Sequence, residues 1–167
     1  MPAVISDASV LISLGAVRQL HLLQKFYHEV VVPDAVWQEV TVGAASRAGA
    51  KEAIQANQQG WLKVGTPSNH MLVVSLQTKL DAGEAEAIAL ASELGASMLL
   101  MDESDGRNEA KSLGLTVTGT LGVLLRAKQT GALAALKPVL DTLIHQHCFR
   151  LGRGLYEQAL RQVGETP

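Results

Sequence analysis

Short apolar runs alternate with longer segments of helical periodicity along most of this chain, and this alternation limits the possible folds. The clearest strand candidates are residues 3–6, 29–32, 97–101 and 115–118, with weaker ones at 61–64 and 71–76. Helical patterns occupy 8–25, 34–42, 46–58, 82–94, 104–113 and 119–130. Such alternation is typical of βαβ units. We therefore predict an α/β fold with a mainly parallel sheet that helices cover on both faces.

The length and the C-terminal pattern predict one domain. The chain has 167 residues, which suits a single domain with a substantial core. Gly60, Gly65 and Pro67 indicate a loop in the middle of the chain rather than a domain boundary. From about residue 132 onward only helical patterns occur. We expect residues 1–167 to form one domain with a helical C-terminal extension from about 132.

Composition excludes several classes of protein. The net charge of −2 excludes the strongly basic character of a protein that coats nucleic acid, but not an enzyme that acts on one. Cys148 is the only cysteine, so neither a disulfide framework nor a thiolate zinc site is expected. No apolar run reaches the ~18 residues of a membrane span, and no signal peptide is visible. We expect a soluble cytoplasmic protein without a membrane segment.

Two aspartates stand at the ends of predicted strands. Asp7 follows the first strand, and Asp102 follows the strand at 97–101. Ligands of open parallel sheets bind beyond the carboxyl ends of the strands, so these carboxylates could approach each other there. Alone they would repel each other, and a hard divalent cation, Mg²⁺ or Mn²⁺, would relieve that repulsion. Each aspartate also suits the N-cap of the helix after it, so a structural role stays open.

A glutamate on the third predicted helix is a further candidate. Helical spacing places Glu39 on the same face as Val36 and Val40, which form an apolar stripe. A glutamate on a buried stripe suggests a functional site. A salt-bridged Glu39, or one that reaches out to solvent, is the alternative.

The helical segment 82–94 offers two more glutamates. Glu84 shares a face with Ile88, whereas Glu86 shares one with Leu90, so Glu84 is the better candidate. Asp81 and Glu84 also have the spacing of a capping box, which is the structural alternative for Glu84.

Together these motifs resemble those of PIN-domain proteins. They are "ISDASVLISL" with Asp7 and Ser9, "VVVPDAVWQEV" with Glu39, "LDAGEAEAIALASELGA" with Glu84 and "LLMDESDGR" with Asp102. The segments "GLTVTGTLGVLLRAKQTG" and "FRLGRGLYEQALRQVGE" are similar to the DUF3368-like subgroup. The resemblance implies a three-layer α/β/α sandwich with a central mainly parallel sheet and a cluster of acids that holds Mg²⁺ or Mn²⁺.

The resemblance also implies roles for individual residues. It implies four catalytic and metal-binding acids, with a hydroxyl that supports the first of them: Asp7, Glu39, Glu84 and Asp102, supported by Ser9. The third acid departs from the commonest pattern, where many relatives have Asp, so Glu86 stays an alternative metal ligand. Asp105 is a candidate for a second metal.

The function that the resemblance implies is hydrolysis of RNA phosphodiesters. PIN proteins are typically ribonucleases, and many bacterial and archaeal members are VapC-type toxins paired with a small antitoxin protein. Arg107, Lys111 and Arg126 follow the acidic motifs and are candidates for contacts with RNA phosphates, although each also suits a solvated helix face.

Partners are predicted from an apolar surface. The predicted helix at 8–25 and the residue after it carry more apolar side chains than one buried stripe requires: Leu20, Leu22, Leu23 and Phe26. We expect this surface to bind an antitoxin helix or to close a homodimer.

Other classes fit less well. A nucleotide-binding Rossmann protein would need a glycine-rich turn after the first strand, and "SDASVLIS" contains no glycine. A haloacid-type phosphatase would carry Asp where Ser9 stands. The main alternative is a PIN-like module that binds RNA or a partner without cutting it.

Overall fold

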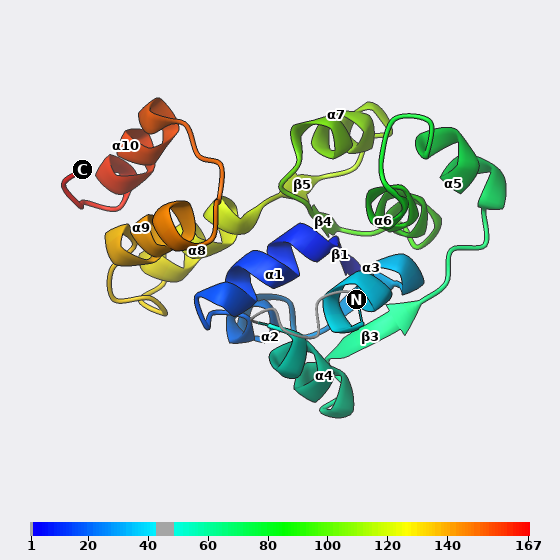
Figure 1. Cartoon of the computed structure of the whole chain (residues 1–167), viewed down its shortest axis with the longest axis horizontal. Helices are drawn as coiled ribbons and strands as arrows, with labels where there is room; N and C mark the ends of the chain where they lie inside the picture. Colours follow the sequence, from blue (N-terminus) through cyan, green and yellow to red (C-terminus); the bar gives the residue numbers. More distant parts are fainter. Residues whose placement is uncertain (1, 43–48) are drawn as a thin grey trace. The chain divides into compact units, whose positions relative to one another are not determined.

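A computed structural model of the chain describes residues 2–42 and 49–167, and its first compact unit, which ends at Thr120, is built around a parallel sheet (Figure 1). The described strands are β1 (Val4–Ser6), β2 (Val30–Pro33), β3 (Leu62–Gly65), β4 (Met98–Leu100) and β5 (Val117–Thr118). They form one sheet in the order β3-β2-β1-β4-β5, and each pairing is parallel.

The direction of strand addition reverses between β1 and β4. The chain adds β2 and β3 on one side of β1 and then adds β4 and β5 on the other. Such a reversal opens a crevice at the carboxyl ends of the two strands. Ser6 is in register with Leu100, and the backbone N–H of Asp7 donates to the carbonyl of Leu100 at 2.9 Å. The strand ends that precede Asp7 and Asp102 therefore meet at this switch point.

Helices flank the sheet, and burial on both faces explains why its strands are apolar throughout. Ile5, Val30, Val32 and Leu100 are fully buried. The helices of this unit are α1 (Ala8–Ala16), α2 (His21–Tyr27), α3 (Asp34–Thr41), α4 (Ala50–Gln58), α5 (His70–Leu76), α6 (Ala82–Glu93) and α7 (Ser104–Ser112). This three-layer α/β/α arrangement confirms the predicted fold class (Figure 1).

The strand predictions are confirmed with one exception. All four clear candidates correspond to strands whose ends differ by one or two residues, and the weaker candidate at 61–64 corresponds to β3. The prediction for 46–58 corresponds to α4 from Ala50 on, and residues 43–48 lie outside the described part of the chain.

The strand predicted at 71–76 is wrong, because this segment forms α5. Asn69 caps the helix by accepting a hydrogen bond from the Leu72 backbone N–H at 3.1 Å. The Glu93 carboxylate, from α6, accepts hydrogen bonds from the backbone N–H groups of Ser68 and Asn69. These bonds satisfy N–H groups that precede the first helical turn. A continuous apolar run does not distinguish a strand from a helix, and the caps decide here.

The single helix predicted at 8–25 is also wrong. α1 ends at Ala16, and α2 begins at His21. Between them Arg18 adopts a left-handed backbone with φ of 58°, and its N–H donates to the carbonyl of Gly15. The break redirects the chain and turns the leucines of α2 inward.

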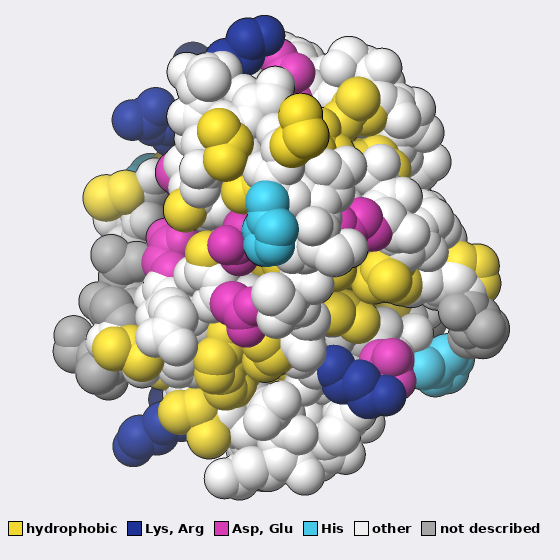
Figure 2. Space-filling model, turned by 90° about the vertical axis from the view of Figure 1, so that its right-hand side faces the viewer, with side chains coloured by type: hydrophobic (Ala, Val, Ile, Leu, Met, Phe, Trp, Pro, Cys, Tyr) yellow, Lys and Arg dark blue, Asp and Glu magenta, His cyan; other side chains and the backbone are white. Residues whose placement is uncertain are grey.

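That redirection corrects the predicted partner surface. Three of the four predicted residues belong to the chain's own core, since Leu20, Leu22 and Leu23 are 3%, 0% and 0% exposed, and Phe26 is half-buried. Exposed apolar side chains lie elsewhere, among them Met71 and Val74 of α5, which are 86% and 64% exposed. On the face of the molecule drawn in Figure 2, several separate hydrophobic patches surround a few acidic side chains.

The second compact unit, Leu121–Pro167, is helical. It contains most of α8 (Thr120–Gln129), together with α9 (Lys137–Gln146) and α10 (Arg153–Gln162). Leu136, Leu140 and Leu160 are fully buried. The helical patterns predicted after about residue 132 correspond to α9 and α10. Nowhere in the described residues does a helix combine the length and the apolar character that crossing a membrane requires.

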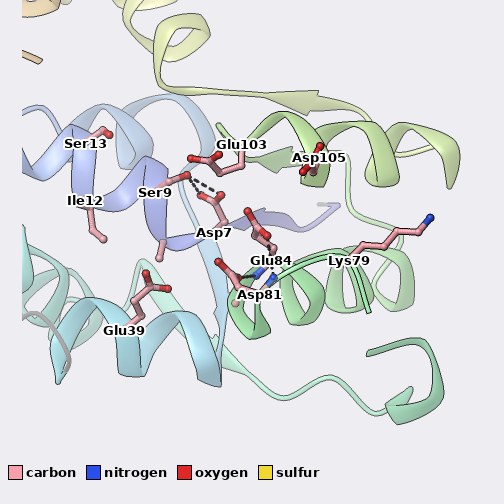
Figure 3. A pocket seen from close by; sticks show the side chains of 12 residues that line it. Asp7, Ser9, Ile12, Ser13, Glu39, Lys79, Asp81, Glu84, Glu103 and Asp105 are labelled. Carbon is pink, nitrogen blue, oxygen red and sulfur yellow. Dashed lines mark hydrogen bonds between the residues drawn. The ribbon is translucent and has the colours of Figure 1, made fainter. Parts of the chain in front are cut away.

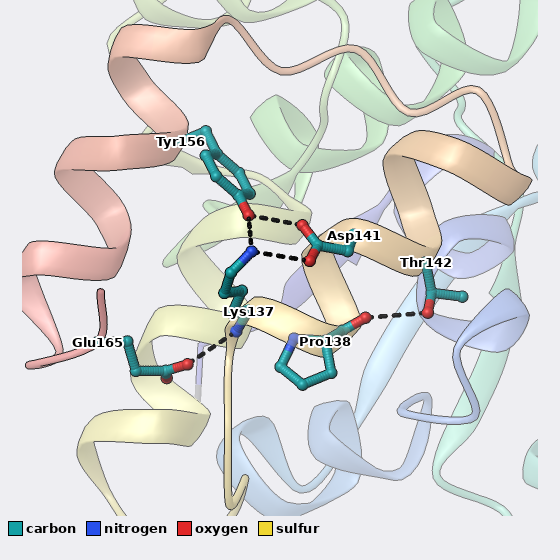
Figure 4. A network of polar contacts seen from close by, with 6 residues as sticks. All are labelled: Lys137, Pro138, Asp141, Thr142, Tyr156 and Glu165. Carbon is teal, nitrogen blue, oxygen red and sulfur yellow. Dashed lines mark hydrogen bonds and ion pairs between the residues drawn. The ribbon is translucent and has the colours of Figure 1, made fainter. Parts of the chain in front are cut away.

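Polar contacts link the helices of the second unit (Figure 4). The Glu165 carboxylate accepts hydrogen bonds from the backbone N–H groups of Leu136 and Lys137 at 2.7 and 3.0 Å, at the start of α9. The Tyr156 hydroxyl on α10 donates to Asp141 at 2.6 Å and accepts from the Lys137 ammonium at 3.0 Å. These contacts attach α10 and the segment after it to the first turns of α9.

Candidate acidic active site

A pocket with a cavity volume of about 500 Å³ lies where β1 ends, at the switch point of the sheet. Its described lining comes from α1, α3, the segment before α6, and the starts of α6 and α7: Asp7, Ala8, Ser9, Ile12, Ser13, Glu39, Lys79, Asp81, Gly83, Glu84, Glu103 and Asp105. Six of these twelve residues are acidic, so the pocket is strongly negative when they are ionised. Figure 3 shows the acidic side chains that surround it.

Asp7 is the most deeply buried of these acids, with 2% of its surface exposed. Its carboxylate caps α1 by accepting a hydrogen bond from the Val10 backbone N–H at 3.1 Å, as the capping alternative predicted. The Ser9 hydroxyl lies 2.9 and 2.8 Å from the two carboxylate oxygens. Burial raises the pKa of Asp7 to about 8, although the bonds from Val10 and Ser9 lower it, and the charges of Asp102 and Glu84 raise it further. Ionised Asp7 therefore needs a compensating positive charge.

Glu84 lines the pocket and forms the predicted capping box. It accepts a hydrogen bond from the Asp81 backbone N–H at 3.1 Å, and its own N–H donates to the Asp81 carboxylate at 2.8 Å. Burial raises the pKa of Glu84; the backbone bond from Asp81 opposes this, and the charges of Asp81, Glu103 and Asp105 add to it. Glu84 therefore combines a helix-capping bond with a position among other acids.

Glu39 reaches the same pocket from α3. Val36 and Val40 are buried as predicted, but Glu39 itself is exposed, because it lies at the edge of the apolar stripe and faces the pocket. A Cβ on Gly83 would lie only 3.4 Å from Glu39 Oε2 and 3.3 Å from the Val36 side chain. The missing side chain at Gly83 thus allows α3 and the Glu39 carboxylate to approach the first turn of α6.

Asp102 is close enough to raise the pKa of Asp7, but it is not among the described residues that line the pocket. Its carboxylate accepts hydrogen bonds from the Thr120 backbone N–H and hydroxyl, each at 2.7 Å. Burial raises the pKa of Asp102, whereas the bonds from Thr120 and the positive charge of Arg107 lower it. A Cβ on Gly119 would lie 2.5 Å from Asp102 Oδ1, so glycine is required there. Asp102 therefore borders the site and anchors the start of α8.

The remaining predicted acids differ in whether they line the pocket. Glu86 does not line the described pocket; its carboxylate accepts a hydrogen bond from the Ala35 backbone N–H at 2.9 Å, at the start of α3. Asp105 and its neighbour Glu103 do line the pocket, from the start of α7. The structure thus brings Glu84 and Asp105 to the pocket and turns Glu86 away.

The predicted RNA-contacting bases do not line the described pocket. Arg107 donates to the Met101 carbonyl at 2.9 Å and lies beside Asp102. Lys111 is exposed on α7, and Arg126 belongs to the second unit. Sequence reasoning missed Lys79, which lines the pocket just before α6. It lies in the short connection before α6, where no periodic pattern indicates the direction of a side chain.

The pocket acids offer the carboxylate oxygens that hard divalent cations prefer. Burial disfavours the ionised form of Asp7, and a bound cation would stabilise that form. In the type of donor atom, though not in a formed geometry, these acids suit Mg²⁺ or Mn²⁺. Across the described ranges, no three Asp, Glu, His or Cys side chains stand arranged as a formed metal-binding group.

A comparison of the sequence with family models identifies the class of protein to which this sheet and its acids belong. The model of a family described as a PIN domain, DUF3368, matches residues 3–165. The chain therefore belongs to the DUF3368 family of PIN-domain proteins.

One solved structure that resembles this chain is a PilT N-terminus domain protein from the hyperthermophilic archaeon Sulfolobus solfataricus P2. It is 24% identical, the match covers 76% of this chain and 93% of that one, and the TM-score is 0.49. A comparison with curated proteins finds no match. The family assignment rests on the family model.

Proposed function

We propose that this protein is a ribonuclease that hydrolyses RNA phosphodiesters with Mg²⁺ or Mn²⁺. One observation carries the proposal: buried Asp7 lies at the switch point of the sheet and lines a pocket with Glu39, Glu84 and Asp105. PIN domains in general are nucleases, so membership of the family supports this activity.

Each acid has a role in this proposal. Asp7, Glu39 and Glu84 would hold the cation, with Asp102 beside them and Asp105 available for a second ion. A bound divalent cation supplies Lewis acidity, which activates water and stabilises charge on the departing oxygen.

The hydrogen bonds around Asp7 orient its carboxylate. Ser9 and the Val10 backbone N–H donate to it and hold it in one direction. Because these bonds also lower the pKa of Asp7, they favour the ionised form that a cation requires.

RNA cleavage in Mn²⁺ tests the proposal, with three proteins compared on one labelled single-stranded RNA. We expect the unaltered chain to cleave, Asp7→Asn to lose cleavage, and Glu86→Gln to keep it. Glu86→Gln is the matched control, because Glu86 is an acid of the same helix as Glu84 whose carboxylate contacts Ala35 outside the described pocket. Cleavage by Asp7→Asn at the rate of the unaltered chain would contradict the proposal.

We further propose that this ribonuclease is the toxin of a toxin–antitoxin pair, with a small antitoxin protein as its partner. This part rests on the resemblance to VapC-type toxins. Expression alone and together with adjacent small open reading frames tests it: growth arrest that a neighbour relieves would support the toxin role. Harmless expression of a catalytically competent protein would argue against it.

The alternative is a PIN-like module that binds RNA or a partner without cutting it. The observation behind this alternative is that Asp7 and Glu84 already serve as helix caps, a structural role that needs no catalysis. RNA binding by the unaltered chain without cleavage in Mg²⁺ or Mn²⁺ would support it.

A further inference from the structure

The acidic pocket includes one basic side chain among its described lining residues, that of Lys79. A substrate that is a polyanion is repelled by the six acids of this pocket. A bound cation offsets this repulsion mainly for the phosphate next to it. Phosphates on either side of the cleaved bond therefore benefit from a positive side chain at the rim. Lys79 is the described lining residue that offers one.

The backbone fixes where Lys79 stands. Its N–H donates to the Leu76 carbonyl at 3.1 Å, and the next residue, Leu80, is 7% exposed and packs in the core. Asp81 then caps α6. The Lys79 backbone is thus held between a core residue and a helix cap, whereas its side chain is 68% exposed and can reorient.

The ammonium of Lys79 is paired with Glu109 of α7 at 3.0 Å. In Figure 3 the side chain extends along the rim, with its nitrogen turned away from Asp7. Exposed ion pairs of this kind hold weakly, because water and salt compete for both charges. A phosphate, which offers several acceptor oxygens, can therefore replace Glu109 as the partner of Lys79.

We propose that Lys79 leaves Glu109 and binds a backbone phosphate next to the scissile one when RNA enters the pocket. Lys79 is thus a substrate-binding residue and Glu109 its competitor. This inference rests on the proposed ribonuclease function.

The test compares steady-state cleavage of a single-stranded RNA in Mn²⁺ by the unaltered chain, Lys79→Met, Lys79→Arg and Glu109→Gln. We expect Lys79→Met to raise KM by about fivefold in 0.1 M salt with kcat little changed, since one single-strand phosphate contact contributes about 0.7 to the salt slope. The slope of log KM against log salt should fall by about 0.7. Lys79→Arg should retain most of the affinity.

Glu109→Gln separates substrate binding from a structural role. If Lys79 binds phosphate, removing its competitor should lower KM by about twofold, the opposite direction to Lys79→Met. If the ion pair only joins the loop to α7, both variants should change KM in the same direction.

Lys63→Met is the matched control, because Lys63 is an exposed lysine in a similar ion pair, 2.7 Å from Glu29, outside the described pocket. It should leave KM and the salt slope unchanged. If the unaltered chain is active and Lys79→Met has the same KM and the same salt slope, this inference is overturned and the ribonuclease function stays intact. No cleavage by the unaltered chain would overturn both.

Discussion

Asp102 and Thr120 form a two-point contact: the Asp102 carboxylate accepts one hydrogen bond from the Thr120 backbone and one from its hydroxyl, each at 2.7 Å. The contact links the residue that follows β4 by two positions to the start of α8. It gives an acid at the candidate site a structural function as well.

Gly119→Ala is expected to disrupt this contact. The new Cβ would lie 2.5 Å from Asp102 Oδ1 and 3.3 Å from the Met101 carbonyl, so the carboxylate must move and lose its partners. We predict a loss of about 2 kcal/mol in the free energy of unfolding, measured with urea. Gly154→Ala, in α10 with no heavy atom within 4 Å of the new Cβ, is the control and should not destabilise. Equal stability of the two variants would contradict this view of Asp102.

Asp7→Asn should stabilise the metal-free protein, measured by urea unfolding in EDTA. The pKa of Asp7 is raised from 3.8 to about 8 in the folded state, mainly by burial. Between these values the unfolded carboxyl is ionised while the folded one stays protonated, so the unaltered chain loses stability as pH rises. The advantage of Asp7→Asn should grow by at most about 1.4 kcal/mol per pH unit in this window and level off above it. An advantage that shrinks with rising pH would contradict this.

Glu165→Gln should destabilise the second unit, with the opposite pH dependence. Burial works against ionisation of Glu165, but backbone bonds from Leu136 and Lys137 hold its pKa below the usual value (Figure 4). The contribution of ionised Glu165 is therefore complete above pH 4.5, its unfolded value, and is lost as pH falls through the folded pKa.

We predict a loss of about 1 kcal/mol in the free energy of unfolding at pH 7 for Glu165→Gln, since glutamine has one acceptor oxygen for the two backbone N–H groups that the carboxylate binds at the start of α9. The difference from the unaltered chain should disappear in acid. Glu157→Gln, which removes a half-buried acid of α10 that pairs with Arg153 and Arg161, should have a smaller effect. A Glu165→Gln effect that persists unchanged in acid would show that the charge is not responsible.

Glu84→Gln and Glu86→Gln should differ in RNA cleavage although they lie two residues apart. Glu84 lines the pocket, whereas Glu86 caps the start of α3 through Ala35, a bond that glutamine can also accept. We expect Glu84→Gln to lower kcat by at least about 100-fold and Glu86→Gln to change it less than about twofold. The reverse order would assign Glu86 to the site.

Much of the fold could be predicted from the sequence because its signals are local. Apolar runs that end just before Asp7 and Asp102 identified β1 and β4. Parallel pairing of these strands then placed both aspartates at the same edge of the sheet. The segment 71–76 could not be predicted, since the Glu93 carboxylate that supports the start of α5 lies far away in the sequence. The break at Arg18 had no glycine or proline to signal it.

The candidate site was predictable in its acids but not in its details. Helical spacing ranked Glu84 over Glu86, which agrees with the positions of the two side chains. Spacing could not reveal that Asp102 contacts Thr120, because that contact depends on how β5 leads into α8. Lys79 was missed for the same reason: it comes from a short connection whose direction only packing determines.

The proposed metal site can be tested by Mn²⁺ binding to the unaltered chain, followed by electron paramagnetic resonance of free Mn²⁺. We predict that Asp7→Asn weakens this binding by about tenfold or more, while Glu86→Gln binds as the unaltered chain does. Because the measurement needs no RNA, it separates the metal site from the choice of substrate. Equal Mn²⁺ affinity for the unaltered chain and Asp7→Asn would contradict the account.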